Sequence, residues 1–203
     1  MTYSISAGWL HGENVRHVPS PNFNQRPHGQ APRLIVIHNI SLPPAQFGGG
    51  YIEAFFQNRL DPQAHPYFAT IADLQVSAHL LIMRTGEVIQ LVSCDDRAWH
   101  AGRSSYLGID NCNDYSIGIE LEGTDDLPFT DAQYQALTPL LMALHQAYPQ
   151  TRSHLTGHSD IAPQRKTDPG LYFDWQRVRQ QLHQHFQGSS YEQTAEHPAQ
   201  PFD

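Results

Sequence analysis

Two histidines and an aspartate stand where they could bind one metal ion. His38 ends a β-branched run at 33–38, and sites on α/β sheets usually form at such strand ends. His158 and Asp168 belong to the loop 157–170, which is punctuated by glycine and proline. Loops of this composition rarely contribute to a hydrophobic core and often carry binding or catalytic residues. Two neutral imidazoles and one carboxylate, with water as the fourth ligand, are a recurring catalytic zinc set, so these residues favour zinc.

A non-haem iron site is the competing interpretation of the same loop. His158-Ser159-Asp160 has the H-x-D spacing of a site with two histidines and one carboxylate. A distant histidine such as His183 would have to complete that set, but His183 falls in the middle of an apparent surface helix. Iron oxygenases of this type usually have all-β folds, whereas this chain has at least three helical patterns. Zinc is therefore favoured over iron.

Glu120 and Lys166 could supply proton transfer and charge stabilisation. Glu120 lies in the alternating segment 116–122 and shares a face with the small residues Ser116 and Gly118, which suggests the wall of a pocket. Lys166 lies two residues before Asp168, so an extended backbone would place both side chains on one side, within reach of a developing oxyanion. The ordinary alternatives are an edge-strand surface glutamate and a solvated lysine.

The hydrophobic pattern predicts a single α/β domain, with a central mixed β-sheet and helices on both faces. Strands are expected at 33–38, 76–83, 87–92 and 116–122. Helices are expected at 51–60, from Thr130 onward and at 171–186. Thr130 and Gln133 form a capping-box signature, and Pro139 should kink or split the helix that they begin. The domain should cover residues 1–187, with an irregular segment at 1–32, and 188–203 should form a loose tail.

Composition narrows the class of partner. The chain has 203 residues, a formal charge of −8 and 13 histidines. The negative charge argues against nucleic acid and anionic membranes, both of which attract a basic face. Cys94 and Cys112 are too few for a disulfide framework, and neither a secretory signal nor a long apolar run is evident. We expect a cytoplasmic protein with no obligate protein partner evident.

Seven motifs occur in one order along the chain. They are VIHNISLPP (36–44), SAH (77–79), AWHAG (98–102), CND (112–114), IGIELEGT (117–124), GHSDIAP (157–163) and RKTDPG (165–170). Together they resemble the zinc N-acetylmuramoyl-L-alanine amidases of the type-2 family, over roughly residues 5–187. The resemblance implies zinc ligands at His38, His158 and Asp168, one Zn2+ per chain, a general base at Glu120 and a transition-state cation at Lys166. His154 matches no ligand position and His79 is expected to be structural.

The resemblance also implies a substrate cleft and an activity. Asn39, Tyr67, Trp99 and His100 fall where the family lines its cleft. The activity implied is hydrolysis of the amide between the lactyl group of anhydro-N-acetylmuramic acid and L-alanine of the stem peptide, in peptidoglycan recycling. A peptidoglycan-binding module that does not cut and an exported wall-lytic amidase are the alternatives.

Two positions depart from the family pattern. Relatives commonly carry arginine where this chain has Gln75 and Asn111, so pairing to peptide carboxylates is expected to be weaker here. Arg97 or Arg103 could supply a cation instead.

Overall fold

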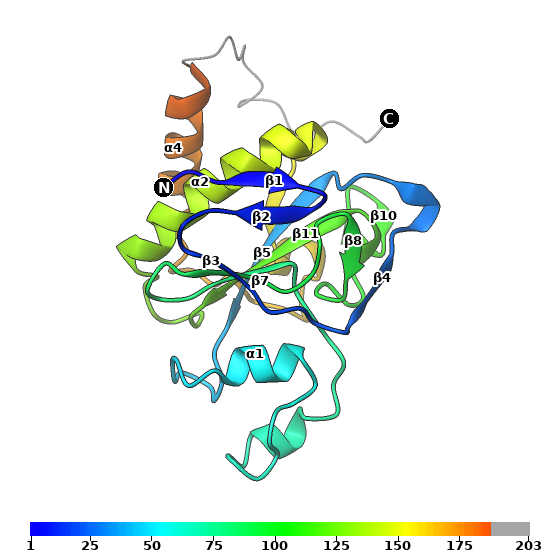
Figure 1. Ribbon diagram of the computed structural model, residues 1–203, viewed down its shortest axis with the longest axis vertical. Coiled ribbons are helices and arrows are strands. Elements are labelled where there is room, and N and C mark those ends of the chain that lie inside the picture. The colour runs from blue at the N-terminus through cyan, green and yellow to red at the C-terminus, as the bar shows by residue number, and fades with distance from the viewer. Residues whose placement is uncertain (188–203) are drawn as a thin grey trace.

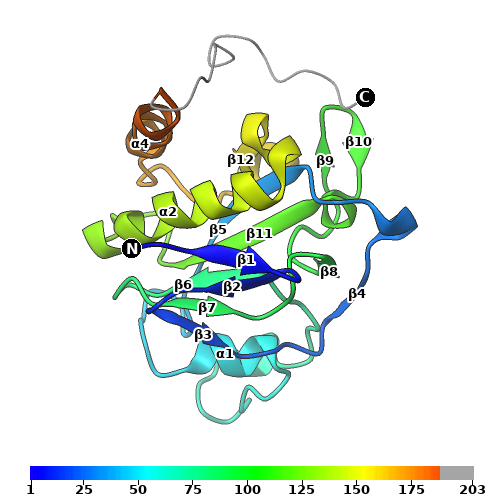
Figure 2. The same cartoon turned by 45° about the horizontal axis from the view of Figure 1, so that its top comes forward.

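Two long, buried strands form the centre of the computed structural model, which describes residues 1–187 except the side chain of His28. They are β5 (Leu34–Ile40) and β11 (Ser116–Glu122), and they pair in parallel (Figure 1). The six-stranded sheet has the order β12-β5-β11-β6-β7-β3, in which only β6 and β7 are antiparallel to each other (Figure 2). The remaining strands of this sheet are β12 (Leu155–Gly157), β6 (Leu80–Ile82), β7 (Val88–Gln90) and β3 (Val15–His17).

The alternation along β11 sends its apolar and polar residues to opposite faces of the sheet. Ile117, Ile119 and Leu121 join a core cluster with residues of α2 (Asp131–Ala147) and α4 (Trp175–Gln187). The other residues of β11 face away from these helices. All seven residues of β11 are nevertheless buried, because the second face is also covered. The polar face of β11 is therefore an internal wall and not a solvent face.

The long helix α2 begins as the capping signature predicted. The Thr130 side chain accepts a hydrogen bond from the backbone N–H of Gln133, and the Gln133 side-chain oxygen accepts one from the backbone N–H of Thr130. Pro139 lies inside α2, which runs unbroken to Ala147, so the predicted possibility of a split helix is wrong. Tertiary packing overrides the local cost of the proline, because Leu137, Leu140 and Leu141 around it are fully buried.

Helices cover both faces of the sheet, as predicted. Figure 2 shows α2 and α4 on one side and α1 (Tyr51–Phe56) on the other. Ile52, Phe55 and Phe56 of α1 pack with apolar residues of β6, β7 and the segment after β7. A further one-turn helix, α3 (His158–Ile161), follows β12 directly and contacts β5.

The N-terminal segment differs from the irregular stretch that the sequence predicts over residues 1–32. It forms the hairpin β1 (Ser4–Ser6) and β2 (Trp9–His11), the edge strand β3 and β4 (Phe23–Gln25), which pairs with β8 (Asp96–Ala98). Gln90 holds the hairpin, since its side chain bonds the backbone of Leu10 at 2.6 Å and of Gly8 at 2.8 Å. β6 and β7 are equally short, but they lie within the longer apolar stretches 76–83 and 87–92. The N-terminal strands lie in no such stretch, which is why the sequence gives no signal for them.

Smaller elements complete the described part of the chain. A two-stranded ribbon joins β9 (Ser105–Tyr106) to β10 (Ile109–Asp110). The short 3-10 turns are η1 (Pro27–Gly29), η2 (Phe68–Thr70), η3 (Cys112–Asp114) and η4 (Pro149–Ser153). Within residues 1–187 no helix is long and apolar enough to cross a membrane. The tail predicted at 188–203 lies outside the described residues.

Candidate metal centre

The carboxyl ends of three parallel strands meet at the predicted site. His38 lies near the end of β5, and Glu120 is its register partner on β11. His158 follows the last residue of β12, on the other side of β5. Both histidines and Glu120 are buried, with at most 9% of each residue exposed. Sites on open α/β sheets form at such strand ends, and here the register of β11 on β5 brings the base candidate to the ligand candidates.

His38, His158 and Asp168 converge on one point. His38 Nδ1 lies 2.9 Å from His158 Nδ1, and both nitrogens lie 3.0 Å from Asp168 Oδ2. Among the described residues, these three form the one cluster of histidine, cysteine and acidic side chains suited to a metal ion. The three residues predicted as ligands are thus brought together by strands and a loop up to 130 positions apart.

The donor atoms of this cluster suit a cation. His158 Nε2 lies 3.1 Å from the carbonyl oxygen of Ala101, which only accepts, so in the neutral form of the ring this nitrogen carries the proton and Nδ1 is bare. Burial lowers the pKa of His38 to about 4, so the His38 ring is neutral at pH 7. Lone pairs of this kind facing one another need a cation between them, and imidazole nitrogen with carboxylate oxygen fits zinc.

Glu120 lies beside this cluster with one carboxylate oxygen unsatisfied. Its Oε2 is buried and has no hydrogen-bond partner among the described residues. Burial and then the nearby Asp168 raise the pKa of Glu120 well above its usual range, while Lys166 lowers it. Lys166 itself is exposed, and its charge reaches both Glu120 and His38. A buried carboxylate with a raised pKa, an exposed cation and a ligand cluster together fit hydrolytic chemistry.

The structure does not support the alternative iron set. Asp160 accepts a hydrogen bond from the Thr156 hydroxyl at 2.7 Å and from the Gly157 backbone N–H at 3.0 Å. Its carboxylate therefore closes the turn that begins α3. His183 is an exposed residue of α4 and is not part of the ligand cluster. In the H-x-D pattern, Asp160 therefore caps the start of α3, and His158 is the first residue of that helix.

Comparison with known proteins agrees with this geometry. The family model for N-acetylmuramoyl-L-alanine amidase matches residues 28–171, which include both histidines, Asp168, Glu120 and Lys166. The chain belongs to this amidase family. The enzyme is 58% identical over 175 residues to the 1,6-anhydro-N-acetylmuramyl-L-alanine amidase AmpD of Escherichia coli (strain K12), an alignment that covers 86% of this chain and 94% of that one.

Solved structures of amidases show the same fold. A crystal structure of a selenomethionine AmpD derivative, 56% identical, superposes with a TM-score of 0.85 and covers 88% of this chain and 98% of that one. AmpDh3 from Pseudomonas aeruginosa, solved in complex with anhydromuramic pentapeptide, is 27% identical with a TM-score of 0.59, covering 83% and 72%. The single α/β amidase domain with its mixed sheet is therefore confirmed.

Three of the four residues expected to line the cleft are engaged with the protein itself. Asn39 donates to Asp125 Oδ1 at 2.7 Å and to the Pro169 carbonyl at 3.1 Å. The indole of Trp99 donates to Asn24 Oδ1 at 2.7 Å. His100 is 9% exposed and its ring lies behind His38, with 2.9 Å between His100 Nδ1 and His38 Nε2. His100 is therefore almost enclosed behind His38, and its place in the lining of the cleft stays a prediction.

Tyr67 and the histidines judged structural occupy ordinary positions. Tyr67 precedes η2 with 38% of the residue exposed. His79 accepts from the backbone N–H of Gly118 at 3.0 Å, which fixes the strand next to the site. His154 contacts the Tyr106 hydroxyl at 3.4 Å and is not part of the ligand cluster.

Asp125 is a site-supporting residue that the sequence does not reveal. Its carboxylate accepts from Asn39 and from the Thr167 hydroxyl, and Thr167 lies between Lys166 and Asp168. Gly170 follows the same loop with φ +82°, and a Cβ there would lie 2.4 Å from Asp125 Cα, so only glycine allows this approach. Asp125 therefore clamps the loop that carries the predicted ligand and cation. Its only sequence signal is its place three residues after β11.

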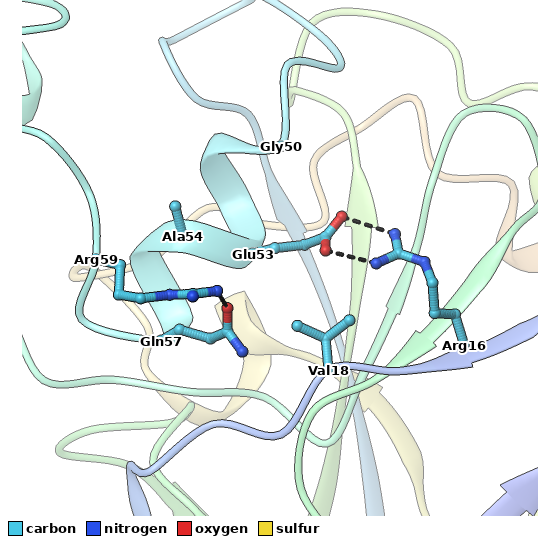
Figure 3. A pocket seen from close by; sticks show the side chains of 7 residues that line it. All are labelled: Arg16, Val18, Gly50, Glu53, Ala54, Gln57 and Arg59. Atoms are coloured by element: carbon cyan, nitrogen blue, oxygen red, sulfur yellow. Dashed lines mark hydrogen bonds and ion pairs between the residues drawn. The ribbon is translucent and has the colours of Figure 1, made fainter.

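A surface pocket of about 510 Å³ lies elsewhere, between β3 and α1. Figure 3 shows Arg16 and Glu53 joined across it by two hydrogen bonds of 2.8 Å, with Arg59 bonded to Gln57 on the opposite wall. None of the residues that line this pocket belongs to the metal cluster. Its charged groups already have partners, so it offers no second reactive centre.

Proposed function

We propose that the enzyme is a zinc-dependent amidase of peptidoglycan recycling. It would hydrolyse the amide between the lactyl group of anhydro-N-acetylmuramic acid and L-alanine of the stem peptide. The observation that carries the proposal is the convergence of His38 Nδ1, His158 Nδ1 and Asp168 Oδ2 beside the unsatisfied oxygen of Glu120. The 58% identity to an enzyme named for this substrate supports the choice of amide.

His38, His158 and Asp168 would hold one zinc ion. When bound, zinc supplies a Lewis acid that polarises the scissile carbonyl and lowers the pKa of a coordinated water to about 7. Neutral imidazoles suit this role, because a protonated ring has no lone pair to give. The burial that lowers the pKa of His38 keeps this ring neutral through the physiological range.

Glu120 would act as general base and then as general acid. Its carboxylate takes a proton from the attacking water as the new C–O bond forms, and it gives this proton to the alanine nitrogen as the C–N bond breaks. Burial and the nearby Asp168 raise its pKa well above the usual range, which makes it a better proton carrier near neutral pH than an exposed glutamate. Oε2 has no hydrogen-bond partner among the described residues, so no structural contact there competes with proton transfer.

Lys166 would stabilise the negative charge that develops on the carbonyl oxygen. Lys166 is exposed and its charge reaches Glu120 and His38, which supports a role close to the substrate carbonyl. A fixed cation beside a developing oxyanion is among the largest single contributions to hydrolysis. The clamp of Asp125 on Thr167 keeps this part of the loop in place.

We also propose a cytoplasmic location for this activity. Both cysteines, Cys94 and Cys112, are buried and free, which suits a reducing compartment. Fractionation of the native host with an antibody to the protein tests this, and recovery in the periplasmic or wall fraction would contradict it.

Mass spectrometry of products tests the activity. Anhydro-muramyl tripeptide is incubated with zinc-loaded enzyme and with enzyme held in chelator. The expected products of the zinc-loaded enzyme are anhydro-N-acetylmuramic acid and the free tripeptide with an N-terminal alanine. Intact substrate in both reactions would favour a module that binds without cutting, and cleavage of intact wall in preference to this substrate would favour a lytic enzyme.

A further inference from the structure

The space behind His38 is shaped to hold one imidazole ring. Gly118 lies on β11 two residues before Glu120, and a Cβ at this position would lie 2.4 Å from Cγ of His100. Ser116, two residues earlier on the same face, places its hydroxyl 3.0 Å from His100 Nε2. The small residues that suggested a pocket wall therefore form the seat of the His100 ring, which packs against His38 with ring centroids 5.0 Å apart.

The hydrogen bonds from this seat run in one direction only. The carbonyl oxygen of Cys112 lies 2.5 Å from Ser116 Oγ and can only accept, so the single hydroxyl proton of Ser116 points to it. Ser116 Oγ must then accept from His100, which puts the proton of the neutral His100 ring on Nε2. His100 Nδ1 is left bare and accepts from His38 Nε2, 2.9 Å away.

We propose that His100 is a positioning residue that holds His38 in the tautomer with a bare Nδ1 aimed at the metal. The inference rests on the zinc site of the proposed function. His158 reaches the same tautomer differently, because its Nε2 faces the Ala101 carbonyl directly. Groups that fix the far nitrogen of a metal-bound histidine set its orientation, and losing one typically costs about 10–100-fold in metal affinity.

A hydrogen-bonding role and a purely packing role for His100 predict different effects of removing the Ser116 hydroxyl. The hydrogen-bonding role predicts the following result. Removing the hydroxyl of Ser116 leaves the ring in its seat but removes the acceptor that orders its proton. The Ser116→Ala enzyme should then bind zinc about 10–100-fold more weakly, although Ser116 does not touch the cluster. Thr151 is a matched control: its buried hydroxyl donates to the Tyr148 carbonyl at 2.7 Å and lies 2.9 Å from His145 Nδ1, in α2 and η4. Thr151→Val should lose stability with zinc affinity unchanged.

The experiment measures zinc affinity by competition with a chromophoric chelator, on full-length wild-type, Ser116→Ala and Thr151→Val enzymes. Weaker binding in Ser116→Ala alone supports the proposal, and equal affinity in all three proteins overturns it. Two replacements of His100 separate hydrogen bonding from packing. His100→Asn keeps an oxygen near the Nδ1 position and should recover affinity that His100→Phe, which fills the seat without an acceptor, loses. Equal losses in the two variants would overturn the proposal.

Long-range nitrogen–proton NMR of the imidazoles in the zinc-loaded wild-type enzyme tests the tautomer without any substitution. The expected pattern is a proton on Nε2 and none on Nδ1 of His100, and a proton on Nδ1 of His100 would overturn the proposal. Elemental analysis of the same sample distinguishes the two levels of failure. If elemental analysis finds no zinc in the wild-type protein, the proposed function is contradicted. The NMR result for the His100 proton tests the positioning role separately.

Discussion

Glu120 and His38 are register partners on the adjacent parallel strands β11 and β5. Side chains at paired positions of parallel strands leave the same face of the sheet, so the carboxylate stands beside the ligand cluster without belonging to it. This relationship separates the role of holding the metal from the role of moving the proton, and each role can be tested alone.

The first prediction is that the purified enzyme holds about one zinc per chain. His38, His158 and Asp168 supply a complete set of donors, so a chelator should remove the metal and the activity together. Elemental analysis before and after chelation measures this, with activity restored by added zinc. Full activity in the metal-free protein would contradict it.

The second prediction is that Glu120→Gln keeps the metal and loses about 10²–10⁴ in turnover, because it removes a base and not a ligand. Glu122 is the matched control on the same strand, since its carboxylate accepts backbone N–H groups of Gly48 and Arg84. Glu122→Gln should lower the free energy of unfolding by about 1–3 kcal/mol while turnover per folded molecule is kept. Loss of zinc in Glu120→Gln would reassign Glu120 to the ligand set.

The third prediction concerns Asn39, which the family resemblance assigns to the cleft and the structure shows bonded to Asp125 and Pro169. If its role is to hold the loop, Asn39→Ala and Asp125→Ala should both release zinc several-fold faster to a chelator. The KM of the zinc-saturated variants should stay near the wild-type value. A raised KM with unchanged zinc release in Asn39→Ala would instead indicate a direct contact with substrate.

The fourth prediction links His145 to acid sensitivity. Burial and then the charge of Arg152 lower the pKa of His145 to about 4, against 6.5 for the exposed group. The unfolded chain therefore binds this proton more readily, and folded stability is lost as the pH falls below about 6.5. From this one group, the free energy of unfolding should fall by about 2 kcal/mol between pH 7.5 and pH 5.

Urea denaturation at the two pH values measures this loss. His145→Asn is the comparison. In the wild-type protein the Thr151 hydroxyl lies 2.9 Å from His145 Nδ1, and the asparagine amide can still donate a hydrogen bond to this hydroxyl. The drop between pH 7.5 and pH 5 should be smaller in this variant by the same amount. An equal drop in both proteins would contradict the prediction.

The fifth prediction concerns the stem peptide. Gln75 and Asn111 stand where the family resemblance leads us to expect arginines, and Arg97 already bonds Asp114 at 2.5 Å and Asn24 at 3.2 Å. A charge-assisted pair is worth about 1.5–3 kcal/mol, so amidating the peptide carboxylates should change kcat/KM less than the roughly ten-fold that one lost pair would cause. Comparison of anhydro-muramyl tetrapeptide with its amidated form measures this. A large loss would show that a cation such as Arg103 reads those carboxylates.

The elements that position the site could be predicted from the sequence where a local signal is long enough. The alternation of 116–122 gives β11 and its two faces, and the Thr130–Gln133 pair marks the start of α2. The N-terminal strands could not be predicted because, unlike the equally short β6 and β7, they do not lie within a longer apolar stretch. Pro139 was misjudged as a possible break because the packing that holds α2 together is not local.

The sequence by itself determined the residue types of the site: two histidines and an aspartate with zinc-ligand chemistry, a glutamate on a strand face lined by small residues, and a lysine in the same loop as the aspartate. Only the tertiary structure decided how they are used. It turned Asp160 into a helix-capping group, brought Asp125 onto the ligand loop and filled the space beside Ser116 and Gly118 with His100. The reason is physical: a spacing along the chain selects which side chains are available, whereas the direction of each hydrogen bond depends on donors and acceptors that only strand register and loop packing bring within reach.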